Sequence, residues 1–257
     1  MENEENLTPE EELEDLLYEL FELDFDEQEA ISEIEADIYP FLQKNPNNIC
    51  ALIVLMFVEI MHGNRYKAQS LAYKIWEVGG ELPSFFEIIY IENLLSLGLV
   101  DMAMVLLKPR FEQLSVNIND FYSVLLKFSV MTGNTALLRR IEGFDAVSGD
   151  DEELFNLTDK YVRANKNDIF KNVQKIILDS IGENICAYEY MLSDSASPQL
   201  EIQLYLNSEE NRCLFLQQQI NQKIKAFLLS ANATDCDFVK AVVLNIKKHE
   251  AWLPEED

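Results

Sequence analysis

A glycine returns at a fixed interval of 35 residues in this chain, at Gly63, Gly98 and Gly133. Each glycine stands between an apolar run and a second run of helical periodicity, in the stretches MHGNRYKA, LSLGLVDMA and VMTGNTALL. Glycine permits the backbone of a tight turn, so each is expected to join two antiparallel helices. The expected pairs are 49–62 with 66–78, 84–97 with 101–114, and 119–132 with 135–143. Because one pair cannot bury both of its apolar faces, successive pairs are expected to stack.

The residue five positions after each glycine must fit against the preceding helix, and a small residue there allows close approach; these residues are Ala68, Ala103 and Leu138. Two more helices are expected upstream. Thr8, Pro9 and Glu11 predict the start of the first with a capping box, and one apolar stripe follows at Leu13, Leu16, Leu17, Leu20 and Phe21. The second is expected over 27–44 and ends at the breaker sequence KNPNN.

The segments GNRYKA and GLVDMA, with NPNN before the first glycine-terminated helix, resemble tetratricopeptide-repeat proteins over roughly residues 9–145. The tryptophan–leucine–glycine–tyrosine signature of that family is replaced here by Leu52, Leu55, Met56 and Glu59. The resemblance implies a divergent solenoid of helix hairpins (TPR-like), and a generic helical bundle is the alternative.

The pattern changes after the loop GFDAVSGDDEE, which indicates a boundary between domains at 1–147 and 148–257. Helices are expected near 151–164 and 167–181. Alternation of apolar and polar residues around Ile202 predicts a β-hairpin over about 185–206. A long helix is expected from Ser208 to Ala231, then a last helix capped by Asp235 or Asp237, with an inward face of Phe238, Ala241, Val242 and Ile246. The expected fold class is mainly α, with a smaller α+β unit after the solenoid.

The charge of the chain is strongly acidic, with a formal net charge of −26. Acidic residues gather at the start: residues 1–48 hold 17 acids and one base, Lys44. Such a surface repels phosphate backbones, which disfavours direct binding of nucleic acid and allows a basic protein partner. The start of the sequence lacks the features of a signal peptide, and its most apolar run is too short to span a bilayer. We expect a cytoplasmic protein.

Catalytic motifs are not recognisable in the sequence. The four cysteines lie far apart and only two histidines occur, so neither a metal site nor a cofactor is expected. Glu59 and Glu92 interrupt apolar helices, and a buried carboxylate needs a partner or a proton. Pairing with a lysine or tyrosine is the favoured interpretation over catalysis, and the protein is not expected to be an enzyme. The alternative is an enzyme whose site lies in the C-terminal unit.

The resemblance also implies a place for a partner, because the first helix of each hairpin lines the concave groove in tetratricopeptide-repeat proteins. The matching positions predict an apolar groove with a polar end, lined by Ile53, Phe57, Ile60, Met61, Phe85, Ile88 and Glu92. The basic residues with which some members of the family grip a terminal carboxylate are missing here. The same apolar faces could instead be covered by the chain's own N-terminal helix, by its C-terminal half or by a second copy.

Two functional hypotheses follow from these features. The first is a non-catalytic scaffold or chaperone-like protein that binds an apolar or amphipathic client segment in the groove. The second is an acidic inhibitor, of the immunity-protein or antitoxin type, that masks a basic, nucleic-acid-binding partner. Salt distinguishes them, because an acidic face loses affinity with rising salt more steeply than an apolar groove does.

Overall fold

The computed structural model describes residues 7–112, 118–133, 169–181, 185–192, 200–231 and 242–249. The chain forms two compact units, Met1–Asn93 with His249–Asp257 and Leu94–Lys248, and each is described by itself. The protein is mainly helical, with a small sheet in the second unit, which confirms the predicted fold class. Within the described ranges no helix has both the length and the apolar character to cross a bilayer.

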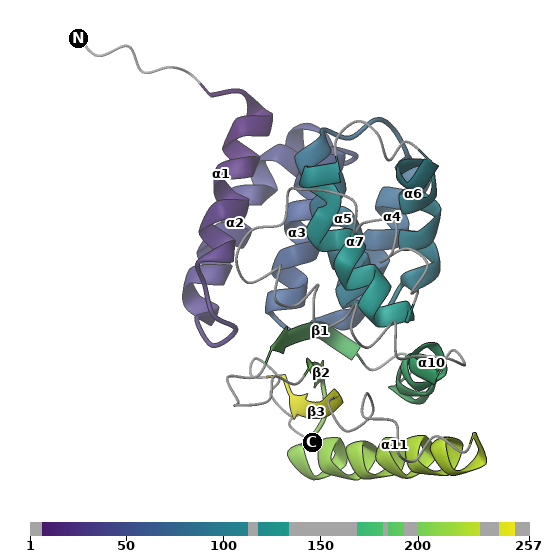
Figure 1. The fold of residues 1–257 in the computed structure, drawn as a ribbon. Coiled ribbons are helices and arrows are strands. Elements are labelled where there is room, and N and C mark those ends of the chain that lie inside the picture. Colours follow the sequence, from purple (N-terminus) through teal and green to yellow (C-terminus); the bar gives the residue numbers. More distant parts are fainter. Residues whose placement is uncertain are drawn as a thin grey trace. The chain divides into compact units, whose positions relative to one another are not determined.

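Five helices build the first unit (Figure 1): α1 (Pro9–Phe21), α2 (Gln28–Lys44), α3 (Ile49–Met61), α4 (Arg65–Val78) and most of α5 (Ser84–Ser96). The capping box of α1 is confirmed. The Thr8 hydroxyl accepts from the Glu11 amide at 3.3 Å, and the Thr8 amide donates to the Glu11 carboxylate at 2.7 Å. The start of α3 is capped in the same way, by the Asn48 side chain on the Ala51 amide at 3.1 Å.

The three repeated glycines all adopt a left-handed backbone, with φ of 68°, 73° and 62° at Gly63, Gly98 and Gly133. After the first, the Asn64 amide donates to the Glu59 carbonyl at 2.7 Å, and after the second the Leu99 amide donates to the Leu94 carbonyl at 2.8 Å. This six-residue bond is the mark of a Schellman helix end. The turns at Gly63 and Gly98 are therefore confirmed, and the small residues five positions later, Ala68 and Ala103, are fully buried. The segment that follows Gly133 lies outside the described residues, so the third turn stays a prediction.

Helix α3 is the centre of the first unit, buried at all but two of its positions. Helices α1, α2 and α4 all pack on it. Helix α1 contributes a stripe that is wholly removed from solvent, Leu13, Leu17 and Leu20. Burial of apolar area on this scale accounts for α1 being docked although six of its 13 side chains are acidic.

The second unit contains α6 (Val100–Glu112), α7 (Ile118–Thr132), α10 (Ile169–Ile181), α11 (Glu210–Ser230) and the strands β1 (Ile185–Leu192), β2 (Leu200–Leu206) and β3 (Val242–Lys248) (Figure 1). The strand order is β1-β2-β3. Strands β1 and β2 pair antiparallel, which confirms the predicted hairpin, and β3 adds to β2 in parallel. Helix α11 packs on β3 and α10.

Strand β3 corrects the sequence-based expectation of a last helix with Val242 and Ile246 on its inward face. The segment alternates with a period of two, since Leu244 and Ile246 are buried while Asn245 and Lys247 are more exposed. The two adjacent valines at its start favour a strand, because branched side chains fit the pleated surface. The caps proposed at Asp235 and Asp237 lie outside the described residues.

The two units divide the chain within α5. The sequence predicted a boundary near residue 147, in the loop GFDAVSGDDEE, and that boundary stays a prediction. That loop lies outside the described residues, as do the predicted helices over 135–143 and 151–164 and the residue Leu138. The remaining predicted helices agree with the structure to within two residues at either end.

Two buried tyrosines give a matched test of the core. The Tyr90 hydroxyl donates to the Ala72 carbonyl at 2.8 Å, whereas the buried Tyr188 hydroxyl has no hydrogen-bond partner among the residues that the structure describes. Burial raises the pKa of both phenols. We expect Tyr90→Phe to lower the free energy of unfolding by about 1 kcal/mol and Tyr188→Phe to raise it by about 1 kcal/mol, because only the first change removes a bond. Urea denaturation measures both, and changes of the same sign would contradict the assignment.

Candidate functional site

The seven residues predicted to line a groove divide into two groups. Ile53, Ile60 and Met61 are buried in the core of the first unit, so the expectation that they face an open groove is corrected. The other four, Phe57, Phe85, Ile88 and Glu92, are partly exposed. Helical periodicity placed all seven on apolar helices, but it does not say which of them another helix covers.

Part of this apolar face is covered by the chain's own helix α1, one of the alternatives that the sequence left open. The Phe21 ring lies 5.5 Å from the Phe57 ring, centroid to centroid, and the Tyr18 ring stacks on the Phe85 ring at 5.3 Å. The Phe85 ring meets the Phe86 ring edge-on at 5.7 Å. These five side chains, which we call the aromatic cluster, join α1 to α3 and α5.

The aromatic cluster reaches the surface through α1. Tyr18 is 55% exposed and Phe21 is 43% exposed, and their rings meet edge-on at 6.3 Å. Residues three or four positions away on a helix are neighbours on its surface, and those around Tyr18 include the carboxylates Glu14, Asp15 and Glu22 as well as Phe21. We call Tyr18, Phe21 and these carboxylates the acidic–aromatic face. The sequence-based interpretation put Phe21 on the buried stripe and left Tyr18 unnoticed.

The negative charge of α1 acts on the helix beneath it. The pKa of the Cys50 thiol, at the start of α3, is raised to about 11, first by burial and then by the charges of Glu10 and Glu14. The carboxylates of α1 therefore lie close enough to α3 to oppose a second negative charge there. A cationic group brought to the same place would be stabilised by the same field.

The carboxylate of Glu59 was expected to find a lysine or tyrosine partner. One carboxylate oxygen accepts a hydrogen bond from the side-chain amide of Asn64 at 2.7 Å, and the other lies 3.3 Å from the Lys67 ammonium. The lysine pairing is confirmed, with Asn64 as a second partner. Since both oxygens are held by residues just beyond the Gly63 turn, this buried carboxylate stabilises the hairpin between α3 and α4.

A polar network near the same turn surrounds His62, which the sequence suggested as an ordinary helix-end residue. The Gln28 amide nitrogen donates to the carbonyls of Phe25 and Met61, at 2.6 and 3.2 Å. The Gln28 oxygen therefore accepts from His62 Nδ1, at 2.6 Å, and His62 Nε2 lies 3.4 Å from the Glu35 carboxylate. These bonds tie α2 to the end of α3.

The far end of this network is Tyr39, whose hydroxyl donates to the Glu35 carboxylate at 2.6 Å. That bond, more than burial, raises the pKa of Tyr39 to about 12. Each polar group of the network thus has a structural partner, and the arrangement presents no activated nucleophile.

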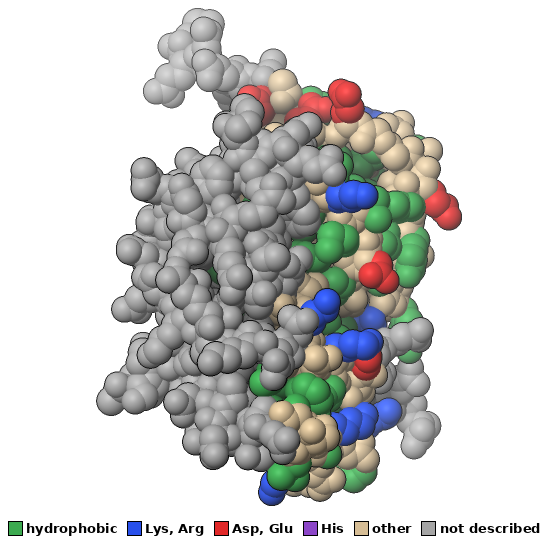
Figure 2. All heavy atoms as spheres, turned by 45° about the vertical axis from the view of Figure 1, so that its right-hand side comes forward, with side chains coloured by type: hydrophobic (Ala, Val, Ile, Leu, Met, Phe, Trp, Pro, Cys, Tyr) green, Lys and Arg blue, Asp and Glu red, His purple; other side chains and the backbone are tan. Residues whose placement is uncertain are grey.

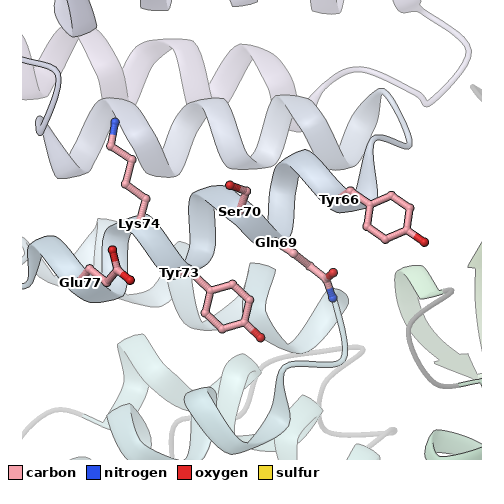
Figure 3. A pocket seen from close by; sticks show the side chains of 6 residues that line it. All are labelled: Tyr66, Gln69, Ser70, Tyr73, Lys74 and Glu77. Carbon is pink, nitrogen blue, oxygen red and sulfur yellow. The ribbon is translucent and has the colours of Figure 1, made fainter.

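A shallow hollow of about 460 Å³ lies along α4, lined by Tyr66, Gln69, Ser70, Tyr73, Lys74 and Glu77. Figure 3 shows Tyr66, Gln69 and Tyr73 projecting to one side of the helix and Lys74 to the other. The Lys74 ammonium donates to the Pro46 carbonyl at 2.8 Å. Hydrophobic, basic and acidic side chains are all interspersed over the described part of the face shown in Figure 2. The hollow offers exposed tyrosine rings but no converging set of catalytic groups.

Metal-binding groups do not converge in the described part of the chain, where no three His, Cys, Asp or Glu side chains meet in a ligating arrangement. Cys50, Cys186 and Cys213 are buried. Burial raises the pKa of Cys213 as it does that of Cys50. The thiols of Cys50 and Cys213 are therefore poor nucleophiles at neutral pH.

Comparison with known proteins places no relative beside this chain: no family model matches it, and no curated protein or solved structure is significantly similar to it. The resemblance to tetratricopeptide-repeat proteins stays a prediction from the residues quoted above. Function is argued from the acidic–aromatic face itself.

Proposed function

We propose that this protein is a non-catalytic protein-binding module whose acidic–aromatic face engages a basic segment with apolar anchors. The observation that carries the proposal is the exposure of Tyr18 and Phe21 among carboxylates on a firmly docked helix. Exposed aromatic side chains are the residues that most often anchor protein interfaces. Surrounding carboxylates would attract a basic segment and orient it before contact.

This proposal keeps the protein partner and the apolar anchors of the sequence-based hypothesis, and it moves the contact to the outer side of α1. A client in an open groove would need to reach Ile53, Ile60 and Met61, which are buried. The partly exposed Phe57, Phe85, Ile88 and Glu92 would border the contact. Because the rings of the aromatic cluster hold one another in place, little side-chain entropy would be lost on binding.

A second candidate function is that of an acidic inhibitor, which the negative charge of the first two helices favours. From Leu7 to Lys44 the ionisable side chains are carboxylates, with the exceptions of Tyr18, Tyr39 and Lys44. Nearly all of these carboxylates are exposed. Such a surface could occupy the nucleic-acid-binding site of a basic protein. It would act by charge, with little need for Tyr18 and Phe21.

The test uses a synthetic helical peptide of about 18 residues, long enough to form a helix, with leucine on one face and lysine on the other. A second peptide replaces leucine by serine and keeps the charge. We expect Tyr18→Ser with Phe21→Ser to weaken binding of the leucine peptide at least about tenfold, measured by fluorescence anisotropy, because two anchors are lost. The matched control is Tyr66→Ser with Tyr73→Ser, which removes two exposed rings from α4 and should leave affinity unchanged.

The serine peptide separates the two candidate functions. Equal affinity for both peptides, with a steep loss as salt rises, would favour the acidic inhibitor and contradict the aromatic anchors. Equal weakening by the α1 and α4 variants would show that the acidic–aromatic face is not the contact.

A further inference from the structure

Helix α11 differs in charge from the rest of this acidic chain. From Asn211 to Ser230 it carries no Asp or Glu, although the whole chain has a net charge of −26. Its charged side chains over this span are Arg212, Lys223 and Lys225, all exposed. This helix therefore presents a neutral to basic surface.

One face of α11 is fixed within the second unit. Cys213, Ile220 and Leu228 are buried, and the helix packs on β3 and α10 (Figure 1). The Gln217 side chain accepts from the Ile246 amide of β3 at 3.0 Å, and the Lys223 ammonium donates to the Ser180 hydroxyl of α10 at 2.9 Å. These bonds set which side chains point outward.

The opposite face carries an uncharged row that we call the outer stripe: Phe215, Gln219, Gln222, Ala226 and Leu229. Its members are four, three, four and three residues apart, the spacing of a coiled-coil seam. All are exposed, and the two large apolar ends, Phe215 and Leu229, are 57% and 58% exposed. A seam of this kind is complementary to another helix.

The two large apolar side chains of the outer stripe are placed symmetrically about Gln222, which lies seven residues from Phe215 and seven from Leu229. An antiparallel second copy of the helix would set Phe215 against Leu229 of the other copy at both ends, and the two Gln222 amides side by side on a twofold axis. Amides in that position can bond to each other, and polar residues within a seam favour one alignment. Such an isologous contact closes as a dimer.

Charge selects the same partner. Two copies of this chain repel each other wherever their carboxylates meet, and no carboxylate lies along the outer stripe or its flanks from Asn211 to Ser230. We propose that the outer stripe of α11 is the contact through which two copies of the protein associate, antiparallel and with twofold symmetry. The stripe is about 21 Å long, a short contact by comparison with the interfaces of stable dimers, so we expect the dimer to be weak.

This inference does not rest on the peptide-binding proposal, and its salt dependence is the opposite. Salt screens the repulsion between two acidic copies and therefore strengthens the dimer, whereas it weakens a contact between an acidic face and a basic peptide. Sedimentation equilibrium of the full chain over a range of protein and salt concentrations measures the association. A chain that stays monomeric at all of them, or a dimer that weakens with salt, would overturn the proposal.

Variants locate the contact. Phe215→Glu with Leu229→Glu is expected to weaken the dimer at least about a hundredfold, because it removes both apolar ends and adds charge to the seam. The matched control, Tyr73→Glu with Val105→Glu, adds the same charge at two other exposed positions and is expected to change the dissociation constant little. Equal losses in both variants would show that charge alone is responsible and would overturn the assignment.

Cross-linking tests the alignment. A cysteine at Gln222→Cys lies on the proposed twofold axis and is expected to form a disulfide between copies under mild oxidation. The control, Lys225→Cys, places the two cysteines about 9 Å apart along the helix axis, so it is expected to form the disulfide less readily. A higher yield at the control position would overturn the antiparallel alignment.

Discussion

Acidification from about pH 7 to about pH 4.5 is expected to remove about 2 kcal/mol of stability through one side chain, His249. The ring of His249 is buried beside the Phe25 ring, at 4.7 Å between centroids. Burial lowers its pKa from 6.5 to about 4, although a hydrogen bond to the backbone of Ile60 opposes the shift.

The sign follows from which state binds the proton. Above pH 6.5 the ring is neutral in both states and its contribution to stability is complete. As the pH falls from 6.5 towards 4, the unfolded chain takes up a proton that the folded chain does not, so the free energy of unfolding decreases. Below that range this residue causes no further loss.

Urea denaturation of a variant isolates this effect from the titration of the many carboxylates. His249→Leu places an apolar side chain in the site and has no group there to protonate. Its free energy of unfolding should therefore decrease on acidification by about 2 kcal/mol less than that of the wild-type chain. The control His62→Asn removes the only other histidine of the sequence. Its free energy of unfolding is expected to depend on pH as steeply as that of the wild-type chain, because His249 is still present. An identical pH dependence in the wild-type chain and His249→Leu would contradict the assignment.

The helix hairpins were predictable because their signals are local. A glycine with positive φ, a capping box at Thr8 and apolar residues at helical spacing each act within a few residues, so one sequence displays them. The β-hairpin was predictable for the same reason. Strand β3 was missed because Val242 and Ile246 also fit one face of a helix. The signal that distinguishes a strand from a helix here is the alternation of the apolar Leu244 and Ile246 with the polar Asn245 and Lys247.

The candidate site was predictable only in part, because exposure is decided by elements far apart in the sequence. The sequence shows that Ile53 and Phe57 are apolar and four residues apart, but it does not show that Ile53 is buried while Phe57, beside Phe21 of α1, stays partly exposed. The acidic–aromatic face was missed since Tyr18 stands among carboxylates, a pattern typical of any solvated helix face. His249 shows the same limit, because its neighbours Phe25, between α1 and α2, and Ile60, in α3, are far from it in the sequence.

Leu17→Ala tests whether α1 is the cover that this account requires. The Leu17 side chain is wholly buried in the middle of the stripe that docks α1. Its truncation leaves a cavity under the helix and is expected to cost about 2–5 kcal/mol in the free energy of unfolding. The matched control is Leu16→Ala, the same change one residue away at a partly exposed position, which should cost clearly less. Equal costs in urea denaturation would show that α1 is not docked as described.

The same variant decides between the two places where a partner could bind. Loosening α1 exposes the wall formed by Phe57 and Phe85, which binding of a hydrophobic dye would report. If the acidic–aromatic face is the contact, the leucine–lysine peptide binds Leu17→Ala more weakly than the wild-type chain, because Tyr18 and Phe21 are no longer held in place. Tighter binding would mean that α1 occupies the partner's groove and must move aside, which would restore the groove hypothesis. The comparison is made without urea, at a temperature where Leu17→Ala keeps its helical circular dichroism signal. Weaker binding then cannot be attributed to unfolding of the variant.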